Sequence, residues 1–205
     1  WLKKICLKTL AYGMTCFKYK YMLGVSDSVF EEFIFGRFFD KKEKIVGNPI
    51  SVELIRRKTD GSNSGEEYDI AFLGRLSEQK NPLEYIEIVN DIQREMPVKA
   101  VMIGDGELRE IVEEKIQELG LKEIINLKGF LENPYEVLQK CKVLCMPSRW
   151  EGFGLAAVEA LALGVPVVAT EVGGLPGFID ESCGKLCDSK ETFVEEISSL
   201  LSDTE

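Results

Sequence analysis

The sequence predicts an α/β protein built on a doubly wound parallel sheet, a Rossmann-like fold. Two observations lead to this prediction. The expected strands are short, continuous apolar runs, and from about residue 66 onward they alternate regularly with segments of helical length. Strands of this kind are typical of a parallel sheet that helices cover on both faces.

Helix-ending residues set the bounds of these elements. Pro82 stands in the first turn of one helix, and Gly120 and Gly164 follow two others. Strands are expected over 69–74, 98–104, 124–127, 143–146 and 165–170 and around Leu186, and helices over 82–95, 108–119, 135–141, 155–163 and 191–201.

Ligands of such a sheet bind beyond the carboxyl ends of its strands. The loops to inspect are therefore 74–81, 104–107, 129–134, 147–154 and 171–177.

The amino-terminal part is less regular. The expected elements there are a helix over 2–20, a strand over 21–25, a helix that begins at Asp27 and a strand over 44–47. The first residue is Trp, so we expect the chain to begin inside a larger protein.

The run from Thr59 to Glu67 is polar and rich in glycine and serine, as linkers and surface loops are. We therefore expect a linker or loop over 51–67, between residues 1–50 and a domain over 68–205.

Composition excludes several classes of function. The net charge is −10, whereas binding to nucleic acid needs clustered cations. The chain has no histidine, so Ser-His-Asp and Cys-His catalysis and histidine metal sites are excluded within it. Residues 1–26 hold five lysines and no carboxylate. That start is expected to contact anionic lipid or, in the more ordinary interpretation, to be a solvated helix face.

Six cysteines include two pairs with the spacing C-x3-C, Cys141 with Cys145 and Cys183 with Cys187. That spacing is compatible with zinc. Cys145 lies in an expected strand, however, where cysteine acts as a small hydrophobic residue. We therefore predict no metal site.

Two cations, Arg75 and Lys80, follow the first strand of the regular region. A diphosphate needs paired positive charge, and arginine can hold it through two parallel hydrogen bonds. Ordinary surface charge is the alternative.

The stretch from Met146 to Gly164 carries the most information. Gly152 and Gly154 open a helix whose positive end can face an anion. The helix is apolar on all sides, which predicts that it is buried, and Glu159 is its only charge. A buried carboxylate needs a partner, and ribose hydroxyls or a structural Lys or Arg would serve.

Two further loops are rich in glycine. Gly104 and Gly106 resemble the start of a dinucleotide fingerprint, but Arg109 replaces its third glycine. A tight turn beside a nucleotide is the better interpretation than NAD binding. The loop 171–177 can bring backbone close to a ligand or be a plain turn.

Together these motifs resemble the group 1 (GT4) glycosyltransferases from about Tyr68 to Leu200. The shared motifs are Gly-Arg-x4-Lys, Gly-Asp-Gly, Pro-Ser-x-x-Glu-Gly-Phe-Gly-Leu, Glu-x7-Glu, Gly-Val-Pro-Val-Val-Ala and Val-Gly-Gly-x-Pro. Asn81 and Gly177 stand where that family usually has glycine and glutamate. The junction reads Gly47-Asn48-Pro49 in place of Pro-Asn-Gly.

The resemblance implies a GT-B enzyme, in which two Rossmann-like halves enclose the active site. Residues 1–50 would be the end of the amino-terminal acceptor domain and the junction, and 68–205 the donor-binding domain. It also implies retention of anomeric configuration and no cofactor or required metal. Because the acceptor half is largely missing, the isolated chain is expected to be inactive.

Carried over by position, Arg75 and Lys80 would hold the donor diphosphate, and Glu151 would bind the donor sugar as the third catalytic residue. Glu159 would bind the ribose. The remaining donor-binding candidates are glycines and their neighbours, which are Gly74, Gly104, Gly106, Gly129, Phe130, Leu131, Phe153, Gly154 and Leu155.

The expected function is transfer of a sugar from a nucleotide sugar, by default a UDP-sugar, to a glycan or glycolipid acceptor. The alternatives are a nucleotide-sugar 2-epimerase of the same fold and a non-catalytic nucleotide-sugar-binding module. An NAD-dependent dehydrogenase is disfavoured. No apolar run reaches the ~18 residues that span a bilayer. A cytoplasmic location is expected, with peripheral membrane contact at the inner membrane face as the alternative to free solution.

Overall fold

The structure is a computed structural model of the whole chain, and it describes residues 19–26, 41, 43–59 and 65–202. Residues 2–18 of the first expected helix and the whole expected helix from Asp27 lie outside these residues, and Tyr19 and Lys20 are not helical. The chain divides into two compact units, residues 1–49 and 50–205. In the first unit, β1 (Met22–Gly24) pairs in parallel with β2 (Glu43–Ile45).

The second unit contains a six-stranded parallel sheet, as the apolar runs predicted. Its strand order is β5-β4-β3-β6-β7-β8. The bounds are β3 Tyr68–Leu73, β4 Ala100–Ile103, β5 Ile125–Gly129, β6 Cys141–Met146, β7 Val167–Thr170 and β8 Gly184–Cys187.

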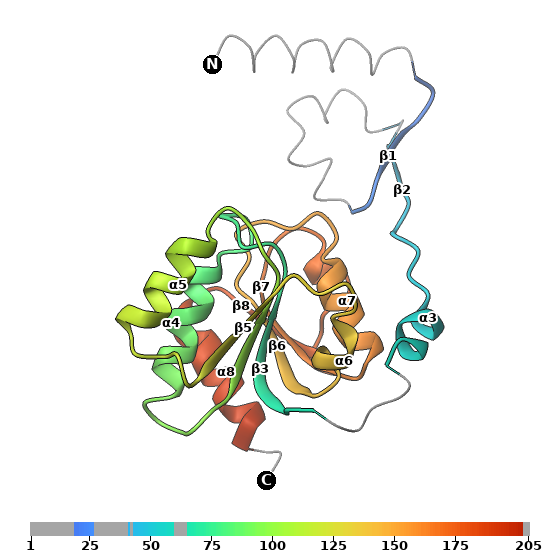
Figure 1. Cartoon of the computed structure of the whole chain (residues 1–205). Helices are drawn as coiled ribbons and strands as arrows, with labels where there is room; N and C mark the ends of the chain where they lie inside the picture. Colours follow the sequence, from blue (N-terminus) through green and yellow to red (C-terminus); the bar gives the residue numbers. More distant parts are fainter. Residues whose placement is uncertain (1–18, 27–40, 42, 60–64, 203–205) are drawn as a thin grey trace, which may run out of the picture. The chain divides into compact units, whose positions relative to one another are not determined.

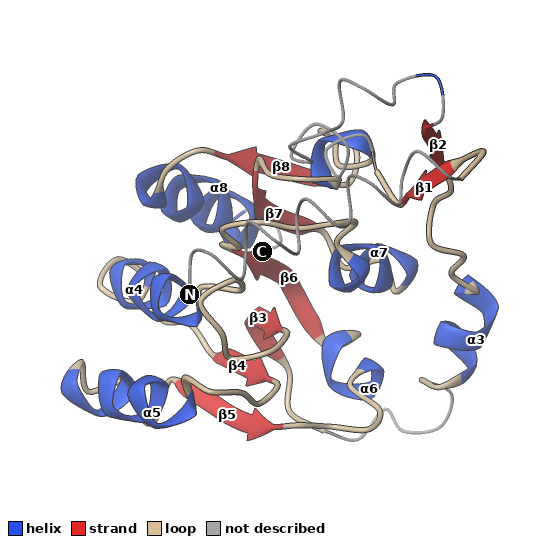
Figure 2. Ribbon diagram, turned by 90° about the horizontal axis from the view of Figure 1, so that it is seen from above, coloured by secondary structure: helices blue, strands red, loops and turns tan. Residues whose placement is uncertain are grey.

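Helices cover both faces of this sheet, so it is doubly wound (Figure 1, Figure 2). Helices α4, α5 and α8 lie on one face, and α6 and α7 lie on the other. Their bounds are α4 Pro82–Ile92, α5 Arg109–Glu118, α6 Tyr135–Leu138, α7 Leu155–Ala162 and α8 Lys190–Ser202.

Two apolar cores result from the alternation of side chains along the strands. Ile70 and Phe72 of β3 pack in the core under α4, α5 and α8, whereas Ala71 packs in the core under α6 and α7. Tyr85 of α4 is completely buried, and its hydroxyl lies 2.9 Å from the carbonyl oxygen of Ile70. The phenol thereby satisfies its polar group inside the first core.

A helix also forms where the sequence analysis expected linker or loop. Helix α3 spans Val52–Arg57, and the hydroxyl of its N-cap, Ser51, accepts a hydrogen bond from the N–H of Leu54 at 3.3 Å. The helix buries Ile55, and Arg56 donates to the carbonyl oxygen of Ala162 at 3.0 Å. The contact ties α3 to the end of α7.

Strand order reverses between β3 and β6. The chain runs outward from β3 to β4 and β5, then returns to place β6 on the other side of β3. In an open α/β sheet this switch point creates the crevice in which ligands bind. The loops that follow β3 and β6 therefore hold the candidate site.

Candidate functional site

Glycines join the carboxyl ends of β3, β4 and β5. Gly74 donates its N–H to the carbonyl oxygen of Ile103 at 3.0 Å, and Gly104 donates to that of Gly129 at 2.8 Å. A Cβ on Gly104 would lie 1.8 Å from the carbonyl oxygen of Gly74. Only glycine fits at that position. Gly74, Gly104 and Gly129 therefore lie side by side at the carboxyl ends of the three strands.

A pocket of about 380 Å³ opens beside these glycines. Gly74 and Arg75 line it from the loop after β3, Gly104 from the loop after β4, and Phe130 and Leu131 from the loop after β5. Phe130 is 77 % exposed. Five of the residues singled out in the sequence thus meet at one pocket.

Arg75 lies against the Gly-Asp-Gly turn. A Cβ on Gly106 would lie 2.9 Å from Cγ of Arg75 and 2.5 Å from the carbonyl oxygen of Leu76, so the turn packs tightly on this segment. Arg75 is exposed, and within the described residues its guanidinium makes no hydrogen bond or ion pair. The group is therefore available to an anion from solution.

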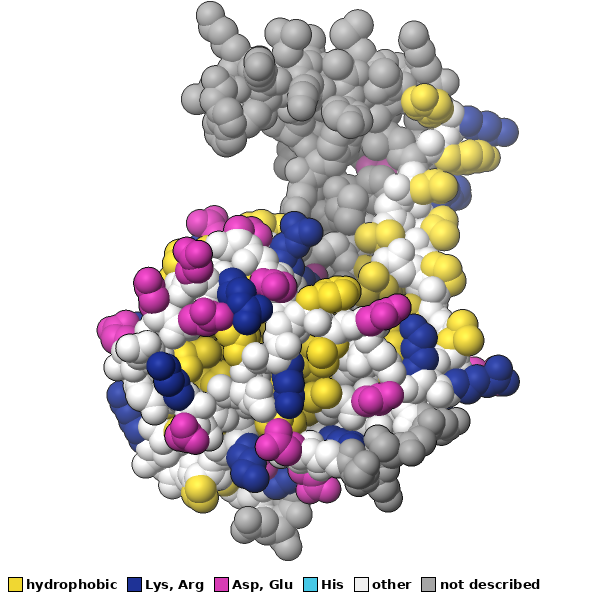
Figure 3. All heavy atoms as spheres, viewed as in Figure 1, with side chains coloured by type: hydrophobic (Ala, Val, Ile, Leu, Met, Phe, Trp, Pro, Cys, Tyr) yellow, Lys and Arg dark blue, Asp and Glu magenta, His cyan; other side chains and the backbone are white. Residues whose placement is uncertain are grey.

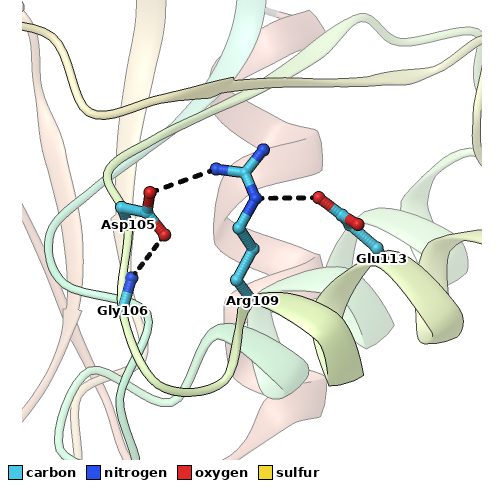
Figure 4. Close-up of polar contacts among 4 residues, drawn as sticks. All are labelled: Asp105, Gly106, Arg109 and Glu113. Carbon is cyan, nitrogen blue, oxygen red and sulfur yellow. Dashed lines mark hydrogen bonds and ion pairs between the residues drawn. The ribbon is translucent and has the colours of Figure 1, made fainter.

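Arg109 occupies the position of the missing third glycine, and carboxylates hold it there (Figure 4). Its Nε donates to Glu113 at 2.9 Å, and its guanidinium lies 3.4 Å from the Asp105 carboxylate. Asp105 also accepts from the N–H of Gly106 at 2.8 Å. Arg109 thus holds the turn through Asp105, at a position where the third glycine of a dinucleotide fingerprint would allow close packing of helix and strand.

Lys80 and Glu151 form an ion pair across the switch point between β3 and β6. The Ser148 hydroxyl donates to the same carboxylate oxygen, Oε1 of Glu151, at 2.8 Å. Glu151 is 7 % exposed. Two residues that the sequence analysis assigned to different parts of the donor are therefore direct partners here.

The backbone of the two loops fixes this pair. The N–H of Arg149 donates to the carbonyl oxygen of Gln79 at 2.8 Å, and Nε2 of Gln79 donates to that of Trp150 at 3.1 Å. Asn81 has a φ of 51°, in the left-handed region. Asparagine tolerates this conformation better than most residues, which explains why it can replace the family's glycine.

The loop 171–177 packs closely on the loop that carries Glu151. A Cβ on Gly173 would lie 1.6 Å from the carbonyl oxygen of Glu151, and one on Gly154 would lie 2.3 Å from the Leu175 side chain. The Phe153 and Phe178 rings lie 5.6 Å apart. The glycine at 173 thus serves the approach of two loops, a role that the sequence analysis did not foresee.

The expectation that α7 is buried on all sides is wrong for this structure. Ala157, Ala160 and Ala162 are buried, but Leu155 is 46 % exposed and Glu159 is half-buried. Its buried alanines face the sheet, and Leu161 packs partly buried against the same core, whereas Leu155 is exposed.

Glu159 has a partner that the sequence did not reveal. Its Oε1 accepts a hydrogen bond from the Tyr135 hydroxyl at 3.2 Å, and no Lys or Arg of the described residues forms an ion pair with it. Burial raises the pKa of Glu159, whereas the Tyr135 hydrogen bond and the charges of Lys58 and Lys80 lower it. The carboxylate therefore lies within electrostatic reach of Lys80.

Sequence reasoning missed three residues near the candidate site, namely Lys58, Tyr135 and Ser148. Ser148 belongs to the quoted Pro-Ser-x-x-Glu motif, three residues before Glu151, so the motif itself carried that signal. Tyr135 follows a loop at the carboxyl edge, and a phenol there was a polar candidate. Lys58 lies far away in the sequence, and no local pattern connects it with Tyr135.

Surface charges and cysteines of the described residues were compared with the expectations from composition. On the face shown in Figure 3, basic and acidic side chains are interspersed over the second unit.

Cys141, Cys145, Cys183 and Cys187 are free, and burial raises the pKa of Cys141 to about 12. The described part of the chain has no group of three or more potential metal ligands of the His, Cys, Asp and Glu types. Nor does it have a helix long and apolar enough to cross a membrane.

The model of the family described as "Glycosyl transferases group 1" matches residues 55–205. Among curated proteins, two Campylobacter jejuni enzymes that add N-acetylgalactosamine to undecaprenol-linked saccharides are similar. One, N-acetylgalactosamine-N,N'-diacetylbacillosaminyl-diphospho-undecaprenol 4-alpha-N-acetylgalactosaminyltransferase, is 30 % identical over 80 % of this chain and 45 % of its own length. The other, an alpha-1,4-N-acetyl-D-galactosaminyltransferase, is 29 % identical over 89 % of this chain and 50 % of its own length. This chain thus spans about half the length of these relatives.

Solved structures share the fold. The pneumococcal O-GlcNAc transferase GtfA, in complex with UDP and GlcNAc, matches with a TM-score of 0.77 at 23 % identity over 94 % of this chain and 40 % of its own. Anabaena HepE, in complex with UDP and glucose, matches with a TM-score of 0.73 at 21 % identity over 90 % and 54 %. The second unit thus has the Rossmann-like fold found in GT-B glycosyltransferases.

Proposed function

We propose, from the premise that this chain belongs to the group 1 glycosyltransferases, that it forms the donor-binding part of a retaining transferase. The substrates would be a nucleoside-diphosphate sugar and a glycan or lipid-linked acceptor. The observation that carries the proposal is the Lys80–Glu151 pair at the switch point, together with the nearby guanidinium of Arg75, which has no hydrogen-bond or ion-pair partner among the described residues. Two cations beside the switch point of the sheet suit a diphosphate.

Each part of the donor has a candidate partner. Arg75 and Lys80 take the diphosphate together with the positive end of α7, through the backbone at 153–155. Both contacts of Glu151 noted above use Oε1, so we assign Oε2 to a hydroxyl of the donor sugar. Glu159 takes the ribose, and the base enters the pocket beside Phe130 and Leu131.

The chemistry follows from this placement. As the bond between the sugar's anomeric carbon and the phosphate oxygen breaks, negative charge builds on the diphosphate, and the two cations and the helix terminus stabilise it. The acceptor hydroxyl forms the new bond from the same face, and its proton passes to the departing phosphate oxygen. Since protein cations neutralise the leaving group, we propose that no divalent metal or other cofactor is required.

UDP is the proposed nucleotide, because the two structures cited above were solved with UDP. GDP and ADP are the alternatives to test. A lipid-linked acceptor is proposed because the Campylobacter relatives are named for undecaprenol-linked substrates. We accordingly propose that the protein works at the cytoplasmic face of a membrane. A 2-epimerase would instead change the donor without any acceptor, and product analysis separates the two.

Replacing Arg75 by alanine in the full-length enzyme, with its acceptor present, should slow sugar transfer about 100-fold, the usual cost of removing one preorganised donor to developing charge. The assay is UDP release from UDP-sugars in the presence of EDTA, in which the wild type is expected to keep its full rate. Arg94→Ala is the matched control, because Arg94 lies beyond the other end of α4 and contacts Asp91 at 3.3 Å. Wild-type turnover in Arg75→Ala, or loss of wild-type activity in EDTA, would contradict the mechanism.

A further inference from the structure

Tyr135 links three segments that are far apart in the sequence. It is the first residue of α6, its hydroxyl donates to Glu159 of α7, and Nζ of Lys58, just after α3, lies 5.5 Å from the centroid of its ring. A lysine at this distance over a phenol ring is attracted by the ring's quadrupole. The contacts thus run from Lys58 through Tyr135 to Glu159, the carboxylate that is proposed to bind the ribose.

The backbone around Lys58 is held on two sides. Nδ2 of Asn133 donates to the carbonyl oxygen of Lys58 at 2.9 Å, which joins it to the start of α6. Arg56 joins the same helix, α3, to the end of α7. Helix α3 accordingly lies beside α6 and α7 (Figure 1, Figure 2). Lys58 is thus fixed with respect to both Tyr135 and Glu159.

We propose that Tyr135 is a positioning residue for Glu159 and that Lys58 holds its ring, so that the carboxylate is aimed at the ribose of the nucleotide. This inference rests on the proposed function, in which Glu159 binds the ribose. Two hydroxyls of a ribose need a carboxylate in one fixed orientation. Because Lys58 holds the Tyr135 ring, the hydrogen bond from its hydroxyl restricts the Glu159 side chain before the nucleotide binds. Less conformational entropy is then lost on binding.

The charges around Glu159 give this role a pH signature. The groups that act on it are Tyr135 from α6, Lys58 from the segment after α3 and Lys80 from the loop after β3. Each lowers the pKa of Glu159, against the burial that raises it. Without the Tyr135 hydroxyl that pKa rises further, so the carboxyl takes up its proton at a higher pH. Affinity for a ribose then starts to fall at a higher pH than in the wild type.

The test compares UDP affinity of the wild type and Tyr135→Phe by titration calorimetry from pH 5.5 to 8. We expect Tyr135→Phe to bind UDP about 5-fold more weakly at pH 7.5, the effect of one hydrogen bond. The deficit should grow as the pH falls. The diphosphate titrates identically in both proteins, so the displacement between the two profiles reports on Glu159. Tyr68→Phe is the control, because Tyr68 is the first residue of β3 and so lies at the amino-terminal end of that strand, away from the candidate site. The affinity profile of this variant should match that of the wild type.

The Glu159→Gln background completes the test. There Tyr135→Phe should change UDP affinity by less than about 2-fold, because the group that it positions is no longer ionisable. A folded Tyr135→Phe protein whose profile coincides with that of the wild type would overturn this inference while Glu159→Gln still weakens UDP binding. If Glu159→Gln itself binds UDP as well as the wild type does, the ribose assignment fails instead. Thermal unfolding of each variant shows whether it is folded.

Discussion

Replacing Lys80 by methionine in the full-length enzyme is expected to reduce sugar transfer by about 10²- to 10³-fold, because a cation aimed at the leaving diphosphate is lost. The same change leaves Glu151 almost buried without its ionic partner. Removing one member of a buried pair commonly costs about 3 kcal/mol. Lys80→Met should therefore also lower the free energy of unfolding, measured by urea denaturation.

A second variant separates these two effects. In Lys80→Met/Glu151→Gln no buried charge is left unpaired, so most of the lost stability should return. Transfer should stay low, because the cation is still absent. A recovery of stability without a recovery of transfer would show that the slow transfer of Lys80→Met does not result from its lost stability. A single variant with wild-type stability and a rate within about 3-fold of the wild type would contradict both assignments.

Alanine at Gly173 is expected to be the most damaging change at any glycine near the site. Gly173 has a φ of +59°, and a Cβ there would lie 1.6 Å from the backbone carbonyl oxygen of Glu151. Neither backbone segment can give way cheaply. We expect a loss of about 3 kcal/mol or more in the free energy of unfolding, together with slow transfer, because Glu151 must shift.

Gly164→Ala is the matched control for this prediction. Gly164 also has a positive φ, +80°, but a Cβ there would meet nothing within 4 Å. Its replacement should cost only about 1 kcal/mol, the penalty for a left-handed alanine, and should leave transfer unchanged. If Gly173→Ala proves no worse than Gly164→Ala in both measurements, the close approach of the two loops does not matter for the site.

The sheet could be predicted from the sequence because its strands are buried on both faces. Runs such as Ile70–Leu73 and Val143–Met146 are apolar throughout, as is typical of strands in a parallel sheet that helices cover on both faces. Helix α3 was missed for the opposite reason. It has six residues and one buried side chain, Ile55, and it stands next to a polar run. A helix that short depends on tertiary contacts, which local patterns do not reveal.

The candidate site was predicted residue by residue, but not its pairings. The motifs placed Arg75, Lys80 and Glu151 on loops at the same edge of the sheet. They could not show that Lys80 reaches Glu151, because that contact depends on β3 and β6 being neighbours although the two residues are 71 positions apart in the sequence. The partner of Glu159 was hidden in the same way, since Tyr135 is 24 residues distant.

The central claim is that this edge of the sheet binds a nucleoside diphosphate. The most direct measurement is the melting temperature of the protein titrated with UDP, GDP, ADP and NAD, in the wild type and in Glu159→Ala. A ligand that binds only the folded state raises the melting temperature by mass action. At a concentration of 100 times its dissociation constant, it adds about 2.7 kcal/mol to the free energy of unfolding. We predict that one nucleoside diphosphate, UDP, stabilises the wild type and not the variant. Stabilisation by NAD alone, or equal stabilisation of both proteins by UDP, would contradict the account.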